Sequence, residues 1–156
     1  MDILLVSNSD TCRSRMAQEI LNSFSRGMKI STAGVWVGNS IPDVVFNVME
    51  QNGYAISRKK PYELEQCIHQ SWDYIITLCP EAEAELGALP SNVKQFHFKF
   101  DDPFQNRMQS EGEQEDRVTA LYDDMYRQLY EFFREELIEQ LLPRCTCGAN
   151  TYCRCE

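Results

Sequence analysis

The residues best suited to chemistry form one polar segment near the start of the chain: Ser7, Asn8, Ser9, Asp10, Thr11, Cys12, Arg13 and Ser14. An apolar run precedes this segment, and a helical pattern of apolar residues follows it. Where a strand turns directly into a helix, backbone N–H groups converge and the helix N-terminus adds positive potential, which favours a tetrahedral anion. Arg13 adds a planar guanidinium that can hold two anion oxygens. The segment therefore predicts an oxyanion site, and an ordinary polar turn is the alternative.

Seven cysteines are many for 156 residues, and they are unevenly distributed. Three are spread through the body of the chain (Cys12, Cys67 and Cys79), and four lie close to its end (Cys145, Cys147, Cys153 and Cys155). The N-terminal sequence Met-Asp-Ile-Leu-Leu-Val has no basic region and no small-residue cleavage site, so no secretory signal is visible. We therefore favour redox, metal or catalytic use of the thiols in a reducing cytoplasm over a secreted disulfide framework.

Composition excludes several classes of protein. A net charge of −9, with 24 acidic and 15 basic residues, argues against a general nucleic-acid-binding protein, which needs a basic surface. No apolar run approaches the ~20 residues that span a bilayer, so no membrane partner is expected. The composition changes abruptly after Pro143. We expect one domain over residues 1–142 and a cysteine-rich tail over residues 143–156.

The elements that must position the polar segment alternate between strands and helices. Strands are expected over residues 2–6, 29–33, 73–78 and 93–100. Helices are expected over 14–27, from a cap at Ser40 to Gly53, within 62–70, over 80–87, and from near residue 113 onward. This alternation predicts a three-layer α/β sandwich with a four-stranded parallel sheet. Ligands of such sheets bind outside the carboxyl ends of the strands, where the first, third and fourth strands are followed by polar loops.

Four motifs resemble the low-molecular-weight protein tyrosine phosphatases and the related thioredoxin-coupled arsenate reductases. The phosphate loop of that superfamily reads Cys-x5-Arg-Ser after the first strand, and this chain has Ser7, five residues and then Arg13-Ser14, with Cys12 at the second loop cysteine. The other matches, in order, are Thr32-Ala33-Gly34, Asp73 to Cys79, and Asn92-Val93-Lys94 leading to Phe100-Asp101-Asp102-Pro103. The resemblance covers residues 2–138 and implies the fold of these enzymes.

Details of the motifs favour the reductase branch. Thr77-Leu78-Cys79 and the Phe-Asp-Asp-Pro sequence ending at Pro103 are similar to the reductases. The phosphatases usually have proline after the loop Arg-Ser, where this chain has Arg15. They also tend to carry two tyrosines after the Asp-Pro, where this chain has Phe104-Gln105.

The resemblance implies a role for each site residue. In these enzymes the loop cysteine is a thiolate nucleophile, because the anion-binding loop and the helix N-terminus lower its pKa. Asp102 matches the aspartate that protonates the leaving oxygen. Cys79 matches the second cysteine of the reductases, which attacks the cysteine–arsenic adduct, releases arsenite and forms a disulfide. The alternative for Asp102 is a turn residue in Asp-Asp-Pro, although its place after the fourth strand favours the acid role. Without the resemblance, Cys79 is better explained as an inert buried thiol.

The chain departs from the pattern at several of these positions. Ser7 stands at the nucleophile, and a hydroxyl is far less acidic than a thiol, so we expect the anion to bind without turnover. Either a deliberate trapping substitution or a naturally inactive member explains the serine. Ser9 and Asp10 replace Gly-Asn, so a carboxylate beside the anion should weaken binding or require a compensating cation. Leu86 stands at the third cysteine of the reductases, which leaves the disulfide relay incomplete.

We therefore expect an arsenate reductase-like enzyme that is inactive as written. The alternatives are a tyrosine phosphatase acting on phosphotyrosine and a non-catalytic relative that binds anions or phosphopeptides. Arsenate, phosphate and sulfate are the expected small ligands. No cofactor is required, although a reductase needs an external thiol reductant of the thioredoxin or glutathione type. The tail, with Cys-x-Cys pairs at Cys145 and Cys153, could bind zinc or trivalent arsenic, supply a resolving thiol, or oxidise pairwise.

Overall fold

The structure is a computed structural model that describes residues 1–105 and 109–142. Its sheet has four strands in the order β2-β1-β3-β4, and every neighbouring pair is parallel. The strands are β1 (Asp2–Ser7), β2 (Lys29–Gly34), β3 (Tyr74–Thr77) and β4 (Lys94–His97). The predicted four-stranded parallel sheet is confirmed.

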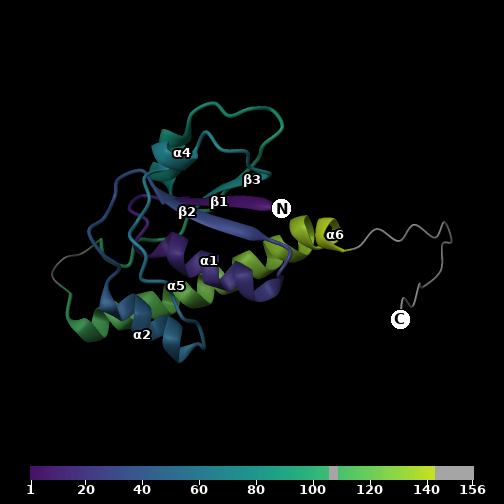
Figure 1. The fold of residues 1–156 in the computed structure, drawn as a ribbon. Helices are drawn as coiled ribbons and strands as arrows, with labels where there is room; N and C mark the ends of the chain where they lie inside the picture. Colours follow the sequence, from purple (N-terminus) through teal and green to yellow (C-terminus); the bar gives the residue numbers. More distant parts are fainter. Residues whose placement is uncertain (106–108, 143–156) are drawn as a thin grey trace, which may run out of the picture.

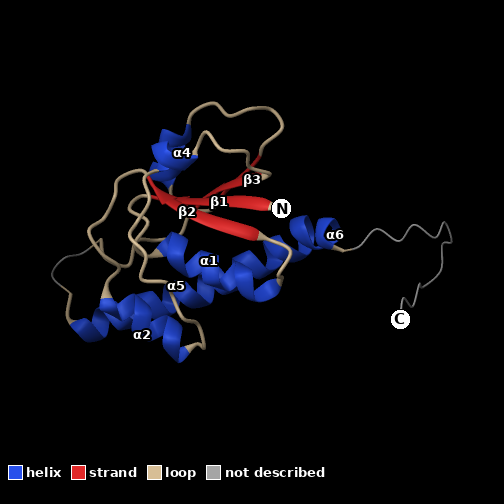
Figure 2. Ribbon diagram, in the orientation of Figure 1, coloured by secondary structure: helices blue, strands red, loops and turns tan. Residues whose placement is uncertain are grey.

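Helices cover both faces of this sheet, as Figures 1 and 2 show. One face carries α1 (Arg13–Phe24), α2 (Asp43–Gln51) and α5 (Glu111–Phe132), and the other carries α3 (Leu64–Cys67) and α4 (Pro80–Leu86). The long last helix continues through a π-helical turn, η1 (Phe133–Leu137), into α6 (Ile138–Leu141). The predicted three-layer sandwich is therefore confirmed. Within the described residues, no helix is long and apolar enough to cross a membrane.

The side chains of β1 alternate between two hydrophobic clusters. Ile3 and Leu5 are buried against α1, α2 and α5, whereas Leu4 and Val6 are buried against α3 and α4. This alternation follows from the two-residue period of a strand, and burial on both faces explains why the strand is apolar throughout. Ser7 shares the parity of Ile3 and Leu5, so its side chain points to the α1 side of the sheet.

Several element boundaries differ from those expected. The N-cap of α2 is Pro42 rather than Ser40, because the extended ψ of 142° at Pro42 ends the loop and starts the helix after it. The helix α5 begins at a capping box between Ser110 and Glu113, slightly earlier than expected. The fourth strand ends at His97, and α3 occupies only four residues of the expected range. The cysteine-rich tail, with its four candidate metal ligands, lies outside the described residues.

Candidate active site

The segment that joins β1 to α1, residues 7–14 (here the anion loop), is held in place by hydrogen bonds to its carbonyl groups. Three successive carbonyls accept hydrogen bonds from the segment after β2: Ser7 from Val35 at 3.1 Å, Asn8 from Trp36 at 2.7 Å, and Ser9 from Gly38 at 3.1 Å. Because a peptide carbonyl and the next N–H point in opposite directions, fixing these carbonyls outward turns the following amides inward. The segment 35–38 thus shapes a cradle of amides.

Most of these amides have no hydrogen-bond partner among the residues that the structure describes. Asp10 donates its N–H to Ser7 Oγ at 3.1 Å, whereas the amides of Asn8, Ser9, Thr11 and Cys12 donate to no group of residues 1–105 and 109–142. Unpaired amides that converge at the start of a helix are an anion-binding arrangement. The structure therefore has the donor set that the sequence predicts for an oxyanion.

Arg13 is fixed at the start of α1, beside the loop that follows β4. The residue is 4% exposed, and Nη1 donates to the Phe100 carbonyl at 2.9 Å. Its Nη2 lies 3.9 Å from Asp102 Oδ2. The structure thus brings Arg13 and Asp102 together, although they are far apart in sequence. The backbone contact holds one side of the guanidinium and leaves the rest available for ligand oxygens.

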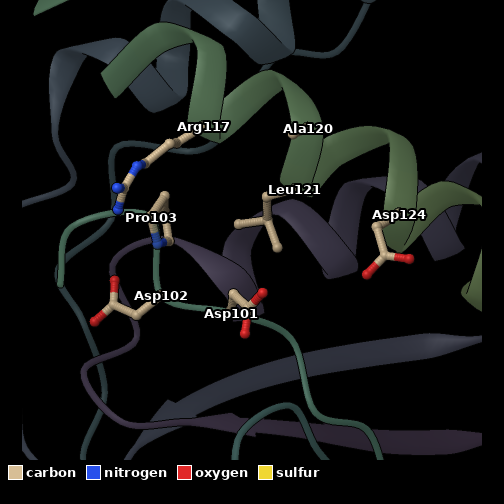
Figure 3. Close-up of a pocket in the computed structure, with 7 residues that line it drawn as sticks. All are labelled: Asp101, Asp102, Pro103, Arg117, Ala120, Leu121 and Asp124. Carbon is tan, nitrogen blue, oxygen red and sulfur yellow. The ribbon is translucent and has the colours of Figure 1, made fainter. Parts of the chain in front are cut away.

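Asp102 lies at the rim of a cavity of about 410 Å³ between its loop and α5. Figure 3 shows Asp101 and Asp102 on the loop side, with Arg117, Leu121 and Asp124 projecting from the helix. The Asp102 side chain is 36% exposed, and its Oδ1 accepts from the Phe104 amide at 2.9 Å. A partly exposed carboxyl beside Arg13 is within reach of solvent and of a ligand in the anion loop, as a proton donor must be.

Asp10 is a buried carboxylate of the anion loop, and it forms an ion pair with Arg15. It is 0% exposed, and its φ of 54° lies in the left-handed region. Arg15 donates Nε to Asp10 Oδ1 at 3.2 Å and Nη2 to Oδ2 at 2.9 Å. Oδ2 also accepts from the Tyr62 amide at 3.0 Å. Arg15 is therefore the compensating cation that the sequence position of Asp10 calls for.

Three of the loop side chains form one hydrogen-bonded chain. Ser7 Oγ donates to Ser14 Oγ at 3.0 Å, and Ser14 Oγ donates to Asp10 Oδ1 at 2.7 Å. Ser7 is 1% exposed, so its hydroxyl is held within the protein. A serine at this position is fully accommodated by the surrounding donors and acceptors.

The two nearby thiols, Cys12 and Cys79, are both buried. Cys12 is buried with its Sγ 3.7 Å from Met16 Sδ, and burial raises the pKa of this thiol to about 12. Cys79 precedes α4 and packs in the cluster on the face of the sheet opposite α1. Burial also raises the pKa of Cys79, while the Arg13 charge acts weakly in the other direction. Neither thiol is an activated nucleophile in this arrangement.

Leu86 shares the buried cluster of Cys79, so the position of the reductases' third cysteine holds an apolar packing residue. Within the described residues, no group of three or more His, Cys, Asp or Glu side chains is placed to hold a metal ion.

Comparison with known proteins identifies the family. The pattern of the low molecular weight phosphotyrosine protein phosphatase family matches residues 2–142. This chain belongs to that family. An arsenate reductase of Staphylococcus aureus (strain N315) is 30% identical over 105 residues, which cover 65% of this chain and 77% of that protein.

Solved structures of the family share the fold. A thioredoxin-dependent arsenate reductase of Corynebacterium glutamicum is 14% identical, with a TM-score of 0.66 over 85% of this chain and 60% of that one. A low molecular weight protein tyrosine phosphatase of T. tengcongensis is 16% identical, with a TM-score of 0.69 over 86% of this chain and 98% of that one. Both branches of the superfamily therefore have the architecture described above.

Sequence reasoning misses two features that shape the site. It treats Arg15 only as a departure from the phosphatases, yet Arg15 holds Asp10. It assigns no role to the segment 35–38, yet this segment fixes the loop carbonyls. Two sequence signals could have indicated these features. Asp10 and Arg15 are an acid and a base five residues apart at the start of a helix, and Gly34 and Gly38 lie at the end of the second strand and shortly after it.

Proposed function

We propose that this protein is an arsenate reductase-like member of the family, that residues 7–14 bind arsenate or another tetrahedral oxyanion, and that Ser7 leaves the site without its nucleophile. The observation that carries the proposal is the cradle itself, where four amides have no partner in the described part of the chain and lie beside the fixed guanidinium of Arg13. The S. aureus arsenate reductase relative supports the reductase branch.

The chemistry defines what Ser7 prevents. Reduction of arsenate to arsenite takes two electrons, which two thiols supply when they become a disulfide, while one arsenate oxygen leaves as water. The first thiol must attack arsenic as a thiolate. The Ser7 hydroxyl cannot form that sulfur–arsenic bond. The chain as written therefore binds the oxyanion and does not reduce it.

Cys79 is the proposed second thiol, and the sheet register supports it. Val6 pairs with Thr77, so Cys79 lies one residue beyond the level of Ser7 on the neighbouring strand. With strands ~4.8 Å apart and a rise of ~3.3 Å per residue, the two Cα atoms are roughly 6 Å apart, within the range of a disulfide. The Cys79 side chain packs on the opposite face, so the start of α4 must move for the two groups to meet.

An external thiol must then reduce the disulfide, because Leu86 has no thiol. Thioredoxin or glutathione are the reductants we propose. The C. glutamicum structural relative is described as thioredoxin-dependent, which supports a dithiol protein as partner. The reaction requires no further cofactor. Asp102, beside Arg13, is the proposed proton donor to the leaving oxygen.

The test restores the thiol and follows two reactions. Ser7→Cys protein is assayed for arsenate reduction with thioredoxin or glutathione, and for hydrolysis of an aryl phosphate. Ser7→Cys/Cys79→Ser is the matched control. Arsenate reduction that is lost with Cys79→Ser supports the proposal. Aryl phosphate hydrolysis that is indifferent to Cys79→Ser, without arsenate reduction, contradicts it in favour of a phosphatase. Absence of both reactions contradicts it in favour of a non-catalytic anion-binding protein.

A further inference from the structure

The hydrogen bonds around residue 7 have a fixed direction. Ser7 Oγ accepts the N–H of Asp10 at 3.1 Å and donates its own proton to Ser14 Oγ at 3.0 Å. Ser14 has a single hydroxyl proton, and it donates that proton to Asp10 Oδ1 at 2.7 Å. Ser14 therefore presents a lone pair, not a proton, to residue 7.

Asp10 imposes this direction because its other neighbours can only donate. Arg15 Nε, Arg15 Nη2 and the Tyr62 amide all direct N–H groups at the carboxylate oxygens. Arg15 is itself 2% exposed and is anchored by a further bond from Nη2 to the Lys60 carbonyl at 2.9 Å. A carboxylate surrounded by obligatory donors is an acceptor only, so the proton between Asp10 and Ser14 belongs to Ser14.

We propose that Asp10, held by Arg15, is a positioning residue that accepts the Ser14 hydroxyl hydrogen bond and so keeps residue 7 as a protonated hydrogen-bond donor to Ser14. A hydroxyl such as that of Ser7 fits this arrangement. A thiolate does not, because it needs donors on every side and would face the Ser14 lone pair. Two features of the loop therefore disfavour a thiolate at residue 7. Ser7 itself has no thiol, and the Asp10–Arg15 pair withholds the Ser14 hydroxyl, a donor that a thiolate would use.

The inference concerns the same loop as the proposed function and rests on residue 7 being its nucleophile position. Other groups at this end of the sheet also act on residue 7. Arg13 and the N-terminus of α1 favour a thiolate. Asp102 opposes one, and Cys12 and Cys79 are uncharged thiols in this arrangement. The test must therefore isolate the contribution that passes through Ser14.

The readout is the pKa of a cysteine placed at position 7, measured as the pH dependence of iodoacetamide alkylation of its own tryptic peptide. The first comparison is Ser7→Cys against Ser7→Cys/Ser14→Ala, which removes the Ser14 hydroxyl and keeps the Asp10–Arg15 ion pair. We expect Ser14→Ala to leave the pKa of the introduced thiol unchanged or to lower it, because Ser14 directs its hydroxyl hydrogen to Asp10 and only a lone pair to residue 7. A hydrogen bond to a charged group is worth about one pKa unit or more, so a rise of that size on Ser14→Ala would overturn the proposal.

The second comparison frees the Ser14 proton while keeping the local charge balanced. Ser7→Cys/Asp10→Asn/Arg15→Gln replaces the buried ion pair with two amides. We expect the pKa of the introduced thiol to fall by about one unit, and we expect Ser14→Ala in this background to abolish the fall. An unchanged pKa in a protein that still melts cooperatively would overturn the proposal. Asp2→Asn/Lys29→Gln, which removes an exposed ion pair at the other end of β1 and β2, is the matched control and should leave the pKa unchanged.

No oxyanion and no reductant enters this measurement. A failure of the inference therefore leaves the proposed function standing, and the absence of arsenate reduction in the assays above leaves the thiol pKa comparison standing.

Discussion

Gly34, at the end of β2, lies so close to Asp10 that a Cβ atom at Gly34 would be 2.8 Å from the Asp10 amide nitrogen. The other nearest atoms are also backbone atoms, Ser9 C at 2.7 Å and Trp36 O at 3.0 Å. Backbone atoms cannot move aside as a flexible side chain can. The anion loop is therefore supported directly by the end of the neighbouring strand.

This contact makes Gly34→Ala a test of the support. The added methyl group must push the loop away from β2, so we expect the free energy of unfolding to fall by about 1–3 kcal/mol. Urea denaturation measures this change. Gly112→Ala in α5 is the control, because a Cβ there meets nothing within 4 Å and alanine favours a helix. Equal stabilities of the two variants would contradict the described packing.

Asp102→Asn should change binding and catalysis in opposite directions. In the unaltered chain, removing a negative charge 3.9 Å from Arg13 should strengthen arsenate binding about two- to fivefold, the range expected of a partly exposed ion pair. In Ser7→Cys protein the same change should lower turnover by about 10²- to 10⁴-fold, since it removes a general acid.

Titration calorimetry and steady-state rates give the two values for Asp102→Asn. Asp101→Asn removes the neighbouring carboxylate and is the matched control. If Asp102→Asn and Asp101→Asn had the same effect on turnover, Asp102 would be a turn residue and not the acid.

The buried thiol of Cys12 predicts a loss of stability at alkaline pH. Its pKa rises from an ordinary value of 9.0 to about 12, mainly through burial. Between these values the unfolded chain releases a proton that the folded chain keeps, so the free energy of unfolding falls as the pH rises through that window. Urea denaturation at several pH values measures the slope. Cys12→Ala should lose part of the slope, and an unchanged slope would contradict the assignment.

The sequence predicts much of this fold because its signals are local. The nearly continuous apolar run over residues 73–78 identifies a strand covered on both faces, and the helical spacing of apolar residues from Val118 identifies the last long helix. The spacing from Ser7 to Arg13 identifies the anion loop, since the chemistry of such a loop lies in consecutive residues. These features need no knowledge of distant contacts.

The features that sequence reasoning misses depend on distant contacts or on backbone geometry. Arg15 reaches Asp10 because Asp10 adopts a left-handed conformation, and the Tyr62 amide that completes the contact is far along the chain. The burial of Cys79 opposite the anion loop follows from the two-residue period of strand side chains and from the packing of α4. Position along the sequence indicates that Cys79 is near Ser7, but not which face its thiol occupies.

Calorimetric titration of arsenate into the unaltered chain decides whether residues 7–14 form an oxyanion site. We expect binding at one site. We also expect roughly ten- to a hundredfold weaker binding to Arg13→Lys, which keeps the charge but loses the two-pronged guanidinium contact. Arg134→Lys, at an exposed position, should bind like the unaltered chain. No binding to the unaltered chain, or equal affinity of Arg13→Lys, would contradict the assignment of the site.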